Sequence, residues 1–456
     1  MENLRPVALA AAVGVLALAA VGCAHSSVNV DPEVIPRTTQ EAIDDFGRVA
    51  ADYSKAAKDG EWDDATCDEF ATRFEKVYKK HGAMMAVALF NAGAVRERCG
   101  DPVAARAIYE RAVEAAPKLD EAHNQLGVLA LRRGDDTAAL RHFTAAIQAS
   151  PTASAPRNNL AAALRGRYAA EPQDSAFRKA ENQIQNVLAV DSDNRLAFEN
   201  LARLYYDRGR LKDKAYLLLA DLVVSQGLAV SERLKRDSPD LYVIRGLILM
   251  EHEADVRALR AFEEAVTLDP EHGDAHMNIA MIALRFRDFD SAKKSLDVAR
   301  QHPNHEGNIE TYLGLGVAHR GLRDYKQAQK AFERAQELDA ADPRPQYNLG
   351  VLFQEHIAPA ADEFDEGLNR KAIAYFNAFS DKAGADDRYV RDVKDARFRV
   401  GVIKESIQTW IDFADLKAKA DEIERKAKLA EEKERRELLE LERRAQEAAA
   451  KAAASD

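Results

Sequence analysis

The sequence repeats itself with a period of 34 residues over most of its length. Each strong copy places a Gly first, an Ala twelve positions later, an aromatic residue four positions after that, and then a second Ala and a Pro. This spacing suits two antiparallel helices that approach closely around a buried ring, with the Pro ending the second helix. The first two copies carry Gly93, Ala105, Tyr109, Ala112 and Pro117, and then Gly127, Ala139, Phe143, Ala146 and Pro151.

The same frame returns in the second half of the chain. Its clearest later copies are Gly246, Ala258, Phe262, Ala265 and Pro270, and then Gly316, Ala328, Phe332 and Ala335. With weaker copies between them we count about eight between residues 86 and 382. One helix pair cannot bury its apolar face alone, so successive copies must stack into a solenoid.

Turn and insertion signals divide these copies further. Gly100 with Asp101, and Gly134 with Asp135, predict the turn between the two helices of a copy. Segments 166–179, 227–238 and 357–370 interrupt the period, and we expect them to form surface loops.

The repeated residues resemble the tetratricopeptide repeat, and the resemblance covers about two thirds of the chain. It implies an all-α fold, a solenoid of helix-turn-helix repeats that binds other proteins. Together with the terminal segments described below, this gives five expected parts: a signal peptide that resembles that of a lipoprotein over residues 1–22, a linker over 23–39, an N-terminal helical cap over 40–85, the repeat array over 86–382, and a long charged C-terminal helix over 386–456.

The C-terminal helix combines an apolar seam with many charges. Its seam, at roughly heptad spacing, is Trp410, Phe413, Leu416, Ala420, Ile423 and Ala427. Beyond Leu429 charge dominates, and Glu432 and Glu440 each precede an Arg by four residues, which stabilises an exposed helix. We expect the first part to dock on the array as a cap and the last 25 residues to project into solvent. Two alternatives stay open: the helix fills the groove of its own array, or it pairs with a second copy.

The N-terminus predicts export and lipid attachment. One basic side chain, Arg5, precedes an apolar run of roughly 16 residues, which is shorter than the ~20 needed to span a bilayer. The run ends in Ala20-Val21-Gly22-Cys23, which resembles the lipobox of bacterial lipoproteins. The resemblance implies cleavage before Cys23, acylation of its thiol and, with Ala24 next, an outer-membrane location facing the periplasm. The alternatives are a plain secretory signal and an uncleaved membrane anchor. We see no second apolar run of membrane-spanning length.

Three cysteines are present, so acylation of Cys23 leaves Cys67 and Cys99 as a candidate disulfide. If the cap precedes the array, Cys67 begins one helix and Cys99 ends the next helix. Antiparallel packing brings that start and that end together. The alternative is two buried thiols acting as small hydrophobes.

Several chemistries have no support in the sequence. The net charge of −11 argues against a nucleic-acid partner, because phosphate binding needs clustered Lys and Arg. The pairs His272/His276 and His302/His305 lie at expected inter-repeat turns without accompanying cysteines, so we assign them structural roles and predict no metal site. We find no nucleophile motif, catalytic residues, cofactor site or small-molecule substrate, and we predict that the chain is not an enzyme.

The resemblance also implies a concave groove lined by the first helix of each repeat. Peptide-binding positions fall on apolar residues and lack the Asn and Lys that grip a peptide carboxylate. An apolar helix or strand of another protein is the ligand that fits such a groove. The alternative is that a tightly wound solenoid buries these side chains. The groove residues are Val128, Leu131, Val243, Leu247, Met250, Met277, Met281, Leu284, Leu313, Val317, Tyr347 and Val351. Asn91, Asn159, Asn200, Asn278 and Asn348 take a neighbouring position, which we interpret as structural.

The lipobox, the array and the charged tail together resemble the tetratricopeptide-repeat lipoproteins of the myxobacterial adventurous gliding motility apparatus. That resemblance implies a periplasmic scaffold in an envelope-spanning machine, with other envelope proteins as partners. Two alternatives stay open: a scaffold for outer-membrane protein insertion or for pilus and secretin assembly, and an activator of a cell-wall enzyme.

Overall fold

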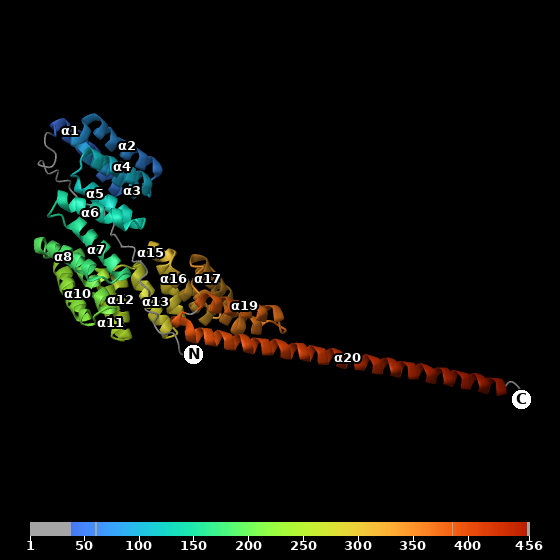
Figure 1. Cartoon of the computed structure of the whole chain (residues 1–456). Coiled ribbons are helices and arrows are strands. Elements are labelled where there is room, and N and C mark those ends of the chain that lie inside the picture. The colour runs from blue at the N-terminus through green and yellow to red at the C-terminus, as the bar shows by residue number, and fades with distance from the viewer. Residues whose placement is uncertain (1–37, 60–61, 385, 454–456) are drawn as a thin grey trace. The chain divides into compact units, whose positions relative to one another are not determined.

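The computed structural model describes residues 38–59, 62–384 and 386–453 (Figure 1). Within these ranges every element of regular secondary structure is a helix. The predicted signal peptide, Cys23 and most of the linker lie outside the described residues. The chain divides into two compact units, one reaching Arg285 and including residues 298–306, the other comprising residues 286–297 and everything from Gly307 onward.

The first unit consists of consecutive antiparallel helices. They are α1 (Gln40–Asp59), α2 (Asp64–His81), η1 (Gly82–Met85), α3 (Ala86–Arg98), α4 (Pro102–Ala115), α5 (Asp120–Arg132), α6 (Asp136–Ala149), α7 (Ser154–Ala170), α8 (Asp174–Val190), α9 (Arg195–Leu211), α10 (Ala215–Leu234), α11 (Pro239–Glu251), α12 (Asp255–Leu268), α13 (Gly273–Arg285) and the short α15 (Pro303–Glu306).

The second unit continues the pattern and ends in one long helix. It contains α14 (Phe289–Ala299), most of which belongs to this unit, then α16 (Ile309–Gly321), α17 (Tyr325–Leu338), α18 (Arg344–Leu352), η2 (Phe353–Ile357), η3 (Ala358–Ala360), α19 (Glu366–Ala383), η4 (Asp387–Tyr389) and α20 (Val390–Ala453). In chain order, the described residues from α3 to α19 supply the eight helix pairs expected from the repeat count. The all-α repeat architecture is thus confirmed.

The repeated Gly and aromatic residues form the contact inside each pair. A Cβ built on Gly127 would lie 2.5 Å from Cε1 of Phe143, and one on Gly93 would lie 2.6 Å from Cε1 of Tyr109. Tyr109 and Phe143 are themselves fully buried. The first helix therefore needs Gly where the ring of the second helix packs against its backbone, which explains the Gly and aromatic pairing at a fixed distance in the sequence.

The turns within the early repeats match the prediction. Gly100 and Gly134 have φ of 77° and 75°, the left-handed conformation that favours Gly. The following residues, Asp101 and Asp135, cap the second helices by accepting hydrogen bonds from backbone N–H groups, each at 2.9 Å. Later turns use Glu253, Arg287 and Arg323 with φ between 57° and 64°. The turn geometry is thus retained where Gly is not.

Two of the three predicted loops are wrong. Segment 166–179 is largely helical, because α7 runs to Ala170 and α8 begins at Asp174. Residues 227–234 continue α10, so that only 235–238 of the second segment lie outside helices, whereas 357–370 contains an irregular stretch before α19. The extra residues of the first two segments are mostly good helix formers, so they lengthen helices.

The expectation of no second membrane-length apolar run is also wrong. Helix α10 has 20 residues and is long and apolar enough to cross a membrane by length and composition alone. It packs against α9 and α11, with Leu217, Ala220 and Val224 in the core. A helix that packs in a protein core and exposes one side can have the same length and apolar composition as a membrane-spanning helix.

Helix α20 divides into a docked part and an exposed part (Figure 1). The docked part packs on α19 through Val393, Ala396, Val400, Ile403 and Ile407, all buried. From Gln408 to Ala450 every side chain is exposed except the half-buried Ala414. Docking of the first part is as predicted, but the exposed part is longer than the expected 25 residues, because the buried side chains of α20 end at Ile407.

Candidate interaction surface

Of the residues predicted to line an apolar groove, half are buried and the other half are half-buried. Val243, for example, is 1% exposed and lies in one core cluster with Ala258 and Phe262 of its own repeat. The groove prediction is therefore wrong for the buried set, because these side chains fill the space between helices. That set is Val128, Val243, Met277, Leu284, Leu313 and Val351.

The half-buried set is Leu131, Leu247, Met250, Met281, Val317 and Tyr347. Tyr347 shows what occupies one end of this surface in the second unit. Its hydroxyl donates to Asp395 of α20 at 2.7 Å, and its ring meets Phe379 edge-on with centroids 5.1 Å apart. Arg399, one turn further along α20, reaches Glu355 at 2.7 Å. At this position the protein's own C-terminal helix covers the predicted binding side chain.

Polar side chains on the first helices link successive repeats of the first unit. Arg132 pairs with Glu97 at 2.7 Å, and Asn159 donates to Asn124 at 2.9 Å. Further along, Arg165 pairs with Asp207 at 3.2 Å and Arg203 pairs with Asp240. These contacts join residues 35 to 42 positions apart. They set the repeat-to-repeat stacking and leave these groups already paired.

Burial and neighbouring charge shape this polar chain. Burial raises the pKa of Glu199, although Ser238 donates to it at 2.6 Å. Burial acts to lower the pKa of Arg203, but the carboxylates of Asp240 and Asp274 raise it overall. Arg203 therefore stays charged inside the array, where each flanking carboxylate stabilises it.

The recurring Asn residues make structural contacts, as expected. Asn91, Asn278 and Asn348 each donate to the carbonyl four residues earlier in their own helix. Asn200 donates to the carbonyl of Asn158 at 3.3 Å, across to the preceding repeat. The prediction of a structural role for them is confirmed.

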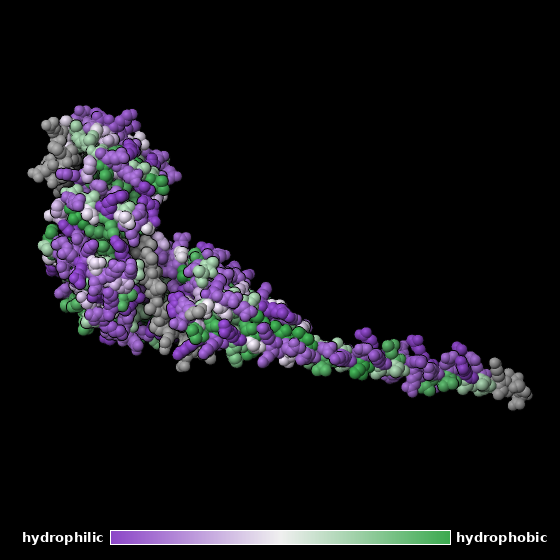
Figure 2. All heavy atoms as spheres, viewed as in Figure 1, coloured by the Kyte–Doolittle hydropathy of each residue, from purple (hydrophilic) through white to green (hydrophobic). Residues whose placement is uncertain are grey.

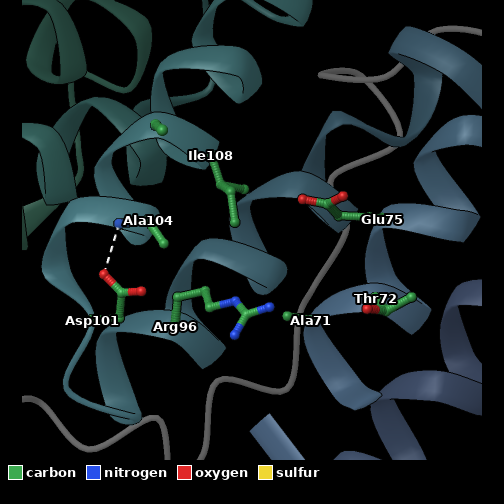
Figure 3. A pocket seen from close by; sticks show the side chains of 8 residues that line it. Ala71, Thr72, Glu75, Arg96, Asp101, Ala104 and Ile108 are labelled. Atoms are coloured by element: carbon green, nitrogen blue, oxygen red, sulfur yellow. Dashed lines mark hydrogen bonds between the residues drawn. The ribbon is translucent and has the colours of Figure 1, made fainter. Parts of the chain in front are cut away.

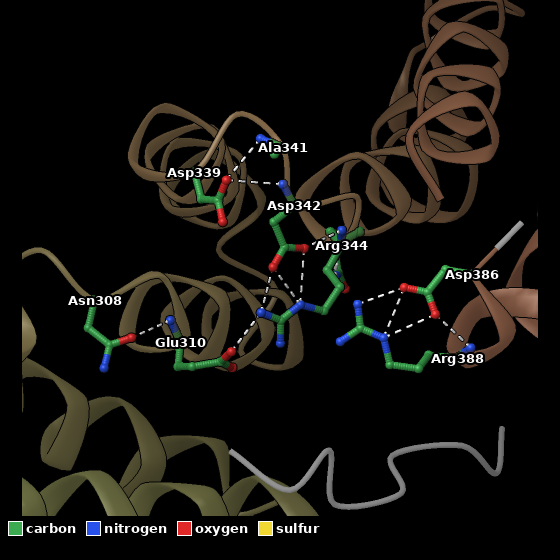
Figure 4. Close-up of polar contacts among 9 residues, drawn as sticks. Asn308, Glu310, Asp339, Ala341, Asp342, Arg344, Asp386 and Arg388 are labelled. Carbon is green, nitrogen blue, oxygen red and sulfur yellow. Dashed lines mark hydrogen bonds and ion pairs between the residues drawn. The ribbon is translucent and has the colours of Figure 1, made fainter. Parts of the chain in front are cut away.

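A parallel set of polar contacts holds the second unit (Figure 4). Arg344 at the start of α18 binds Glu310 of α16 and Asp342 of the preceding turn, each at 2.6 Å. Asp339 accepts from the backbone N–H of Ala341 at 2.9 Å and closes that turn. The two carboxylates raise the pKa of Arg344 despite its burial. Arg344 thus links α16 to α18 by an ion pair, as arginines link successive repeats in the first unit.

His272 and His302 lie in inter-repeat turns, His276 and His305 lie in the helices that follow, and their hydrogen bonds are local. His276 contacts the carbonyl of Pro270 at 2.9 Å, and the Nε2 atom of His305 lies 2.8 Å from Asp274. Hydrogen bonding to His305 and the nearby Arg203 lower the pKa of Asp274, against the effect of its burial. Among the described residues no group of three His, Cys, Asp or Glu side chains could hold a metal ion.

The cysteines are joined. Cys67, near the start of α2, and Cys99, just after α3, form a disulfide with Cα atoms 6.2 Å apart across a sequence separation of 32. Cys67 is buried. The bond ties the N-terminal helix pair to the first repeat at the place that antiparallel packing predicts.

A shallow cavity of about 410 Å³ lies beside this region (Figure 3). Its charged side chains already have partners: Arg96 pairs with Asp68, Glu75 with Arg111, and Asp101 caps α4. Small residues, Ala71 and Ala104 among them, line the rest. The cavity is a surface depression between helices rather than a site with free reactive groups.

Exposed apolar side chains gather on α10 and on α20. The sequence predicted the apolar seam of α20 but not the apolar face of α10. On α10, Leu218, Leu219 and Leu222 are 69%, 42% and 55% exposed. On α20, apolar side chains recur along the exposed part, between hydrophilic ones (Figure 2). The α10 set, named here the α10 leucine face, had a detectable signal, because Leu218 and Leu222 lie one helical turn apart in an apolar run.

Helix pairs stacked through Gly and aromatic contacts define the class as a helical-repeat solenoid. Family models of the tetratricopeptide repeat match residues 257–306 and 309–342. The chain therefore contains tetratricopeptide repeats over these residues, and such repeats serve as protein–protein interaction scaffolds. No match was found among curated proteins.

Solved structures give similar but distant matches. One, from the functional characterization of Pseudomonas aeruginosa pilF, shares 18% identity over 50% of this chain and 95% of that one, with a TM-score of 0.39. A tetratricopeptide-repeat protein from Parabacteroides merdae shares 16% identity over 59% and 98%, with a TM-score of 0.41. A thermophilic tetratricopeptide-repeat protein of Thermus thermophilus shares 18% identity over 44% and 98%, with a TM-score of 0.37.

A further family model, described as the Est1 DNA/RNA binding domain, matches residues 105–206. That stretch carries 13 Lys and Arg against 12 Asp and Glu. Arg132, Arg165 and Arg203 within it are engaged with carboxylates. The stretch therefore lacks the surplus of free positive charge on which phosphate-backbone binding rests.

Proposed function

We propose that this protein is a lipid-anchored scaffold that holds other envelope proteins at the periplasmic face of the outer membrane. The observation that carries the proposal is the helical-repeat array with an exposed apolar patch, the α10 leucine face. Contiguous exposed apolar side chains with a polar rim are typical of protein-binding surfaces. Here Asp221, Ser225 and Gln226 supply polar neighbours on the same helix.

Two further features support the compartment and the anchor. The Cys67–Cys99 disulfide suits an oxidising compartment such as the periplasm, because cytosolic thiols are kept reduced. The lipobox ending at Cys23 supplies the attachment residue, and a single lipidated cysteine leaves the other two free to pair. An outer-membrane lipoprotein combines both.

The anchor is tested by comparing the natural chain with Cys23→Ser in cells that receive labelled palmitate. We expect the natural chain to take up label and to sediment with outer membranes, and Cys23→Ser to stay unlabelled. Label that persists in Cys23→Ser, or a natural chain found in the cytosol, would contradict the anchor. The result does not depend on which proteins bind the array.

The binding surface is tested by crosslinking in cells followed by identification of the attached proteins. In Leu218→Asp/Leu222→Asp we expect loss of the partners that the natural chain captures. The matched control is Val103→Asp/Val256→Asp, which places two charges at exposed apolar positions on α4 and α12. Equal capture by the two variants would remove the α10 leucine face as the partner site.

The same experiment distinguishes the machines the scaffold serves. The resemblance to gliding-motility lipoproteins favours motility proteins as the captured set, and we propose this assignment. Capture of barrel-assembly or secretin proteins would replace it with outer-membrane assembly. Capture of a cell-wall synthase would replace it with trans activation of that enzyme.

A further inference from the structure

The exposed part of α20 carries an apolar stripe that no described residue covers. Its members alternate three and four residues apart, the spacing of a coiled-coil core. Phe413, Leu416 and Ile423 are 64%, 65% and 68% exposed. The full stripe, named here the α20 seam, is Phe413, Leu416, Ala420, Ile423, Ala427 and Ala430.

We propose that the α20 seam pairs two copies of this chain as a parallel, in-register coiled coil over residues 412–431. This pairing goes beyond the scaffold function and does not depend on it. The segment covers about 30 Å at the helical rise, or close to three heptads. It lies directly beyond the part of α20 that docks on α19, where the helix has lost its intramolecular partner.

The charges flanking the α20 seam select a second copy as the occupant. In a parallel pair, the residue just before one core position faces the residue five places later in the partner. Asp412 would then face Lys417, Lys419 would face Glu424, and Lys426 would face Glu431. All three contacts are attractive, and symmetry doubles them.

The opposite orientation is less complementary. In an antiparallel pair centred on the same segment, Lys417 faces Glu431 of the other copy, which is attractive, but Lys419 faces Lys426 and Glu424 faces its own equivalent. Such like-charge contacts disfavour the arrangement. The charge pattern therefore fixes orientation as well as partner.

The favourable pattern ends after Ala430. The next apolar residues are Leu438, Leu439 and Leu441. Leu438 and Leu441 resume the core spacing only after a four-residue insertion in the heptad count, a stutter that locally unwinds a coiled coil. Beyond it the equivalent flanking positions are Glu437 and Glu442, which repel. Because Ala fills half of the α20 seam, we expect a weak dimer that dissociates in the micromolar range.

The alternative is a lone helix held by its own charges. Lys419 pairs with Asp415 and Lys426 pairs with Glu422, each at 2.7 Å and each within one helical turn. These pairs stabilise a helix but need no apolar stripe. They are solvent-exposed, so the lysines can turn toward a partner at little cost.

The test is sedimentation of the folded Cys23→Ser chain over a range of concentrations. We expect a monomer–dimer equilibrium. Lys419→Glu/Lys426→Glu should weaken the dimer roughly tenfold to a hundredfold, because attractive contacts become repulsive. Adding Glu424→Lys/Glu431→Lys to that variant should restore the dimer. The control Arg425→Glu/Arg435→Glu makes the same change in net charge on the outer face and should leave dimerisation unchanged.

Orientation is read from Ala420→Cys in the same background. In a parallel, in-register pair the two introduced thiols lie opposite each other, so mild oxidation should link two chains through Cys at that position. A chain that stays monomeric at every concentration, or a dimer that the charge reversal does not weaken, overturns the proposal. A dimer without the crosslink overturns the parallel register.

Discussion

The Nδ1 atoms of His123 and His142 lie 3.2 Å apart, joining helix α5 to helix α6. His123 is buried, and its Nε2 atom lies 3.2 Å from the carbonyl of Pro117, which can only accept a hydrogen bond. Nε2 of His123 therefore donates, and its Nδ1 is left to accept from His142. The contact needs one unprotonated Nδ1 atom, so it cannot survive when both rings are charged.

The first prediction follows from that geometry. Burial, together with His123 and Arg141, lowers the pKa of His142 from 6.5 to about 4. A lowered folded-state pKa contributes stability that is complete above pH 6.5 and is lost as the pH falls toward 4. Between pH 7 and pH 5 we expect a loss of about 1–2 kcal/mol, discounted for partial exposure. Urea unfolding at the two pH values measures it.

His142→Gln is the matched variant for this prediction, because Gln keeps a hydrogen-bonding group without a charge. We expect its stability to fall less between the same pH values. The ring of His142 can also be titrated directly by NMR. A pKa near 6.5 there, or equal pH dependence of the two chains, would show that the pair does not act in this way.

The second prediction concerns the Gly and aromatic contact. Gly127→Ala puts a methyl group 2.5 Å from Cε1 of Phe143. We expect a loss of about 1–3 kcal/mol from overpacking, even though Ala is the better helix former. Gly166→Ala is the control, since nothing lies within 4 Å of the added methyl, and it should hold or raise stability. Equal unfolding midpoints for both variants would contradict the explanation that Gly127 is needed because the ring of Phe143 packs against it.

The helix pairs could be predicted from the sequence because their constraint is local and repeated. Wherever an aromatic ring packs on the backbone of the first helix, as Tyr109 packs on Gly93, the repeat needs both residue types at a fixed spacing, and that spacing can be seen in the sequence. The extent of helix α10 could not be predicted in the same way. Its extra residues break the period, and a broken period signals an insertion without saying whether the inserted residues are helical.

The apolar groove shows a different limit. Val243 and Leu313 stand at positions that face a peptide in related repeats, yet here they lie buried in the clusters of their own repeats. Position within a repeat gives the direction of a side chain, whereas its exposure depends on how closely neighbouring helices pack. The polar contacts between repeats could not be predicted from the sequence, because residues such as Arg165 and Asp207 are 42 positions apart and do not follow the 34-residue period.

The third prediction concerns the Cys67–Cys99 disulfide. Cys67→Ser/Cys99→Ser should lower the free energy of unfolding by about 3 kcal/mol, because the crosslink restricts the unfolded chain across a loop of intermediate length. The exported Cys23→Ser chain, denatured without reductant, should show no free thiol. Two free thiols would instead favour buried, unbonded cysteines, and reduction would then leave the unfolding midpoint unchanged.

The fourth prediction separates the two parts of α20. A chain ending at Asp415 keeps Val400, Ile403 and Ile407 and the stacking of Trp410 on Phe364 at 5.2 Å, so its stability and hydrophobic-dye binding should match the full chain. A chain ending at Tyr389 loses the whole docked part and uncovers Phe376 and Phe379. We expect stronger dye binding and a loss of roughly 5 kcal/mol from the apolar surface left open.

The comparison between the two shortened chains decides whether α20 caps the array. Both lack the exposed tail, so any difference between them comes from residues 390–415. Tyr347 gives a local readout, because its hydroxyl bonds to Asp395 only when the docked part is present. Equal dye binding by the two chains would mean that the side chains beneath α20 repack without it, and the helix would then be an attachment and not a cap.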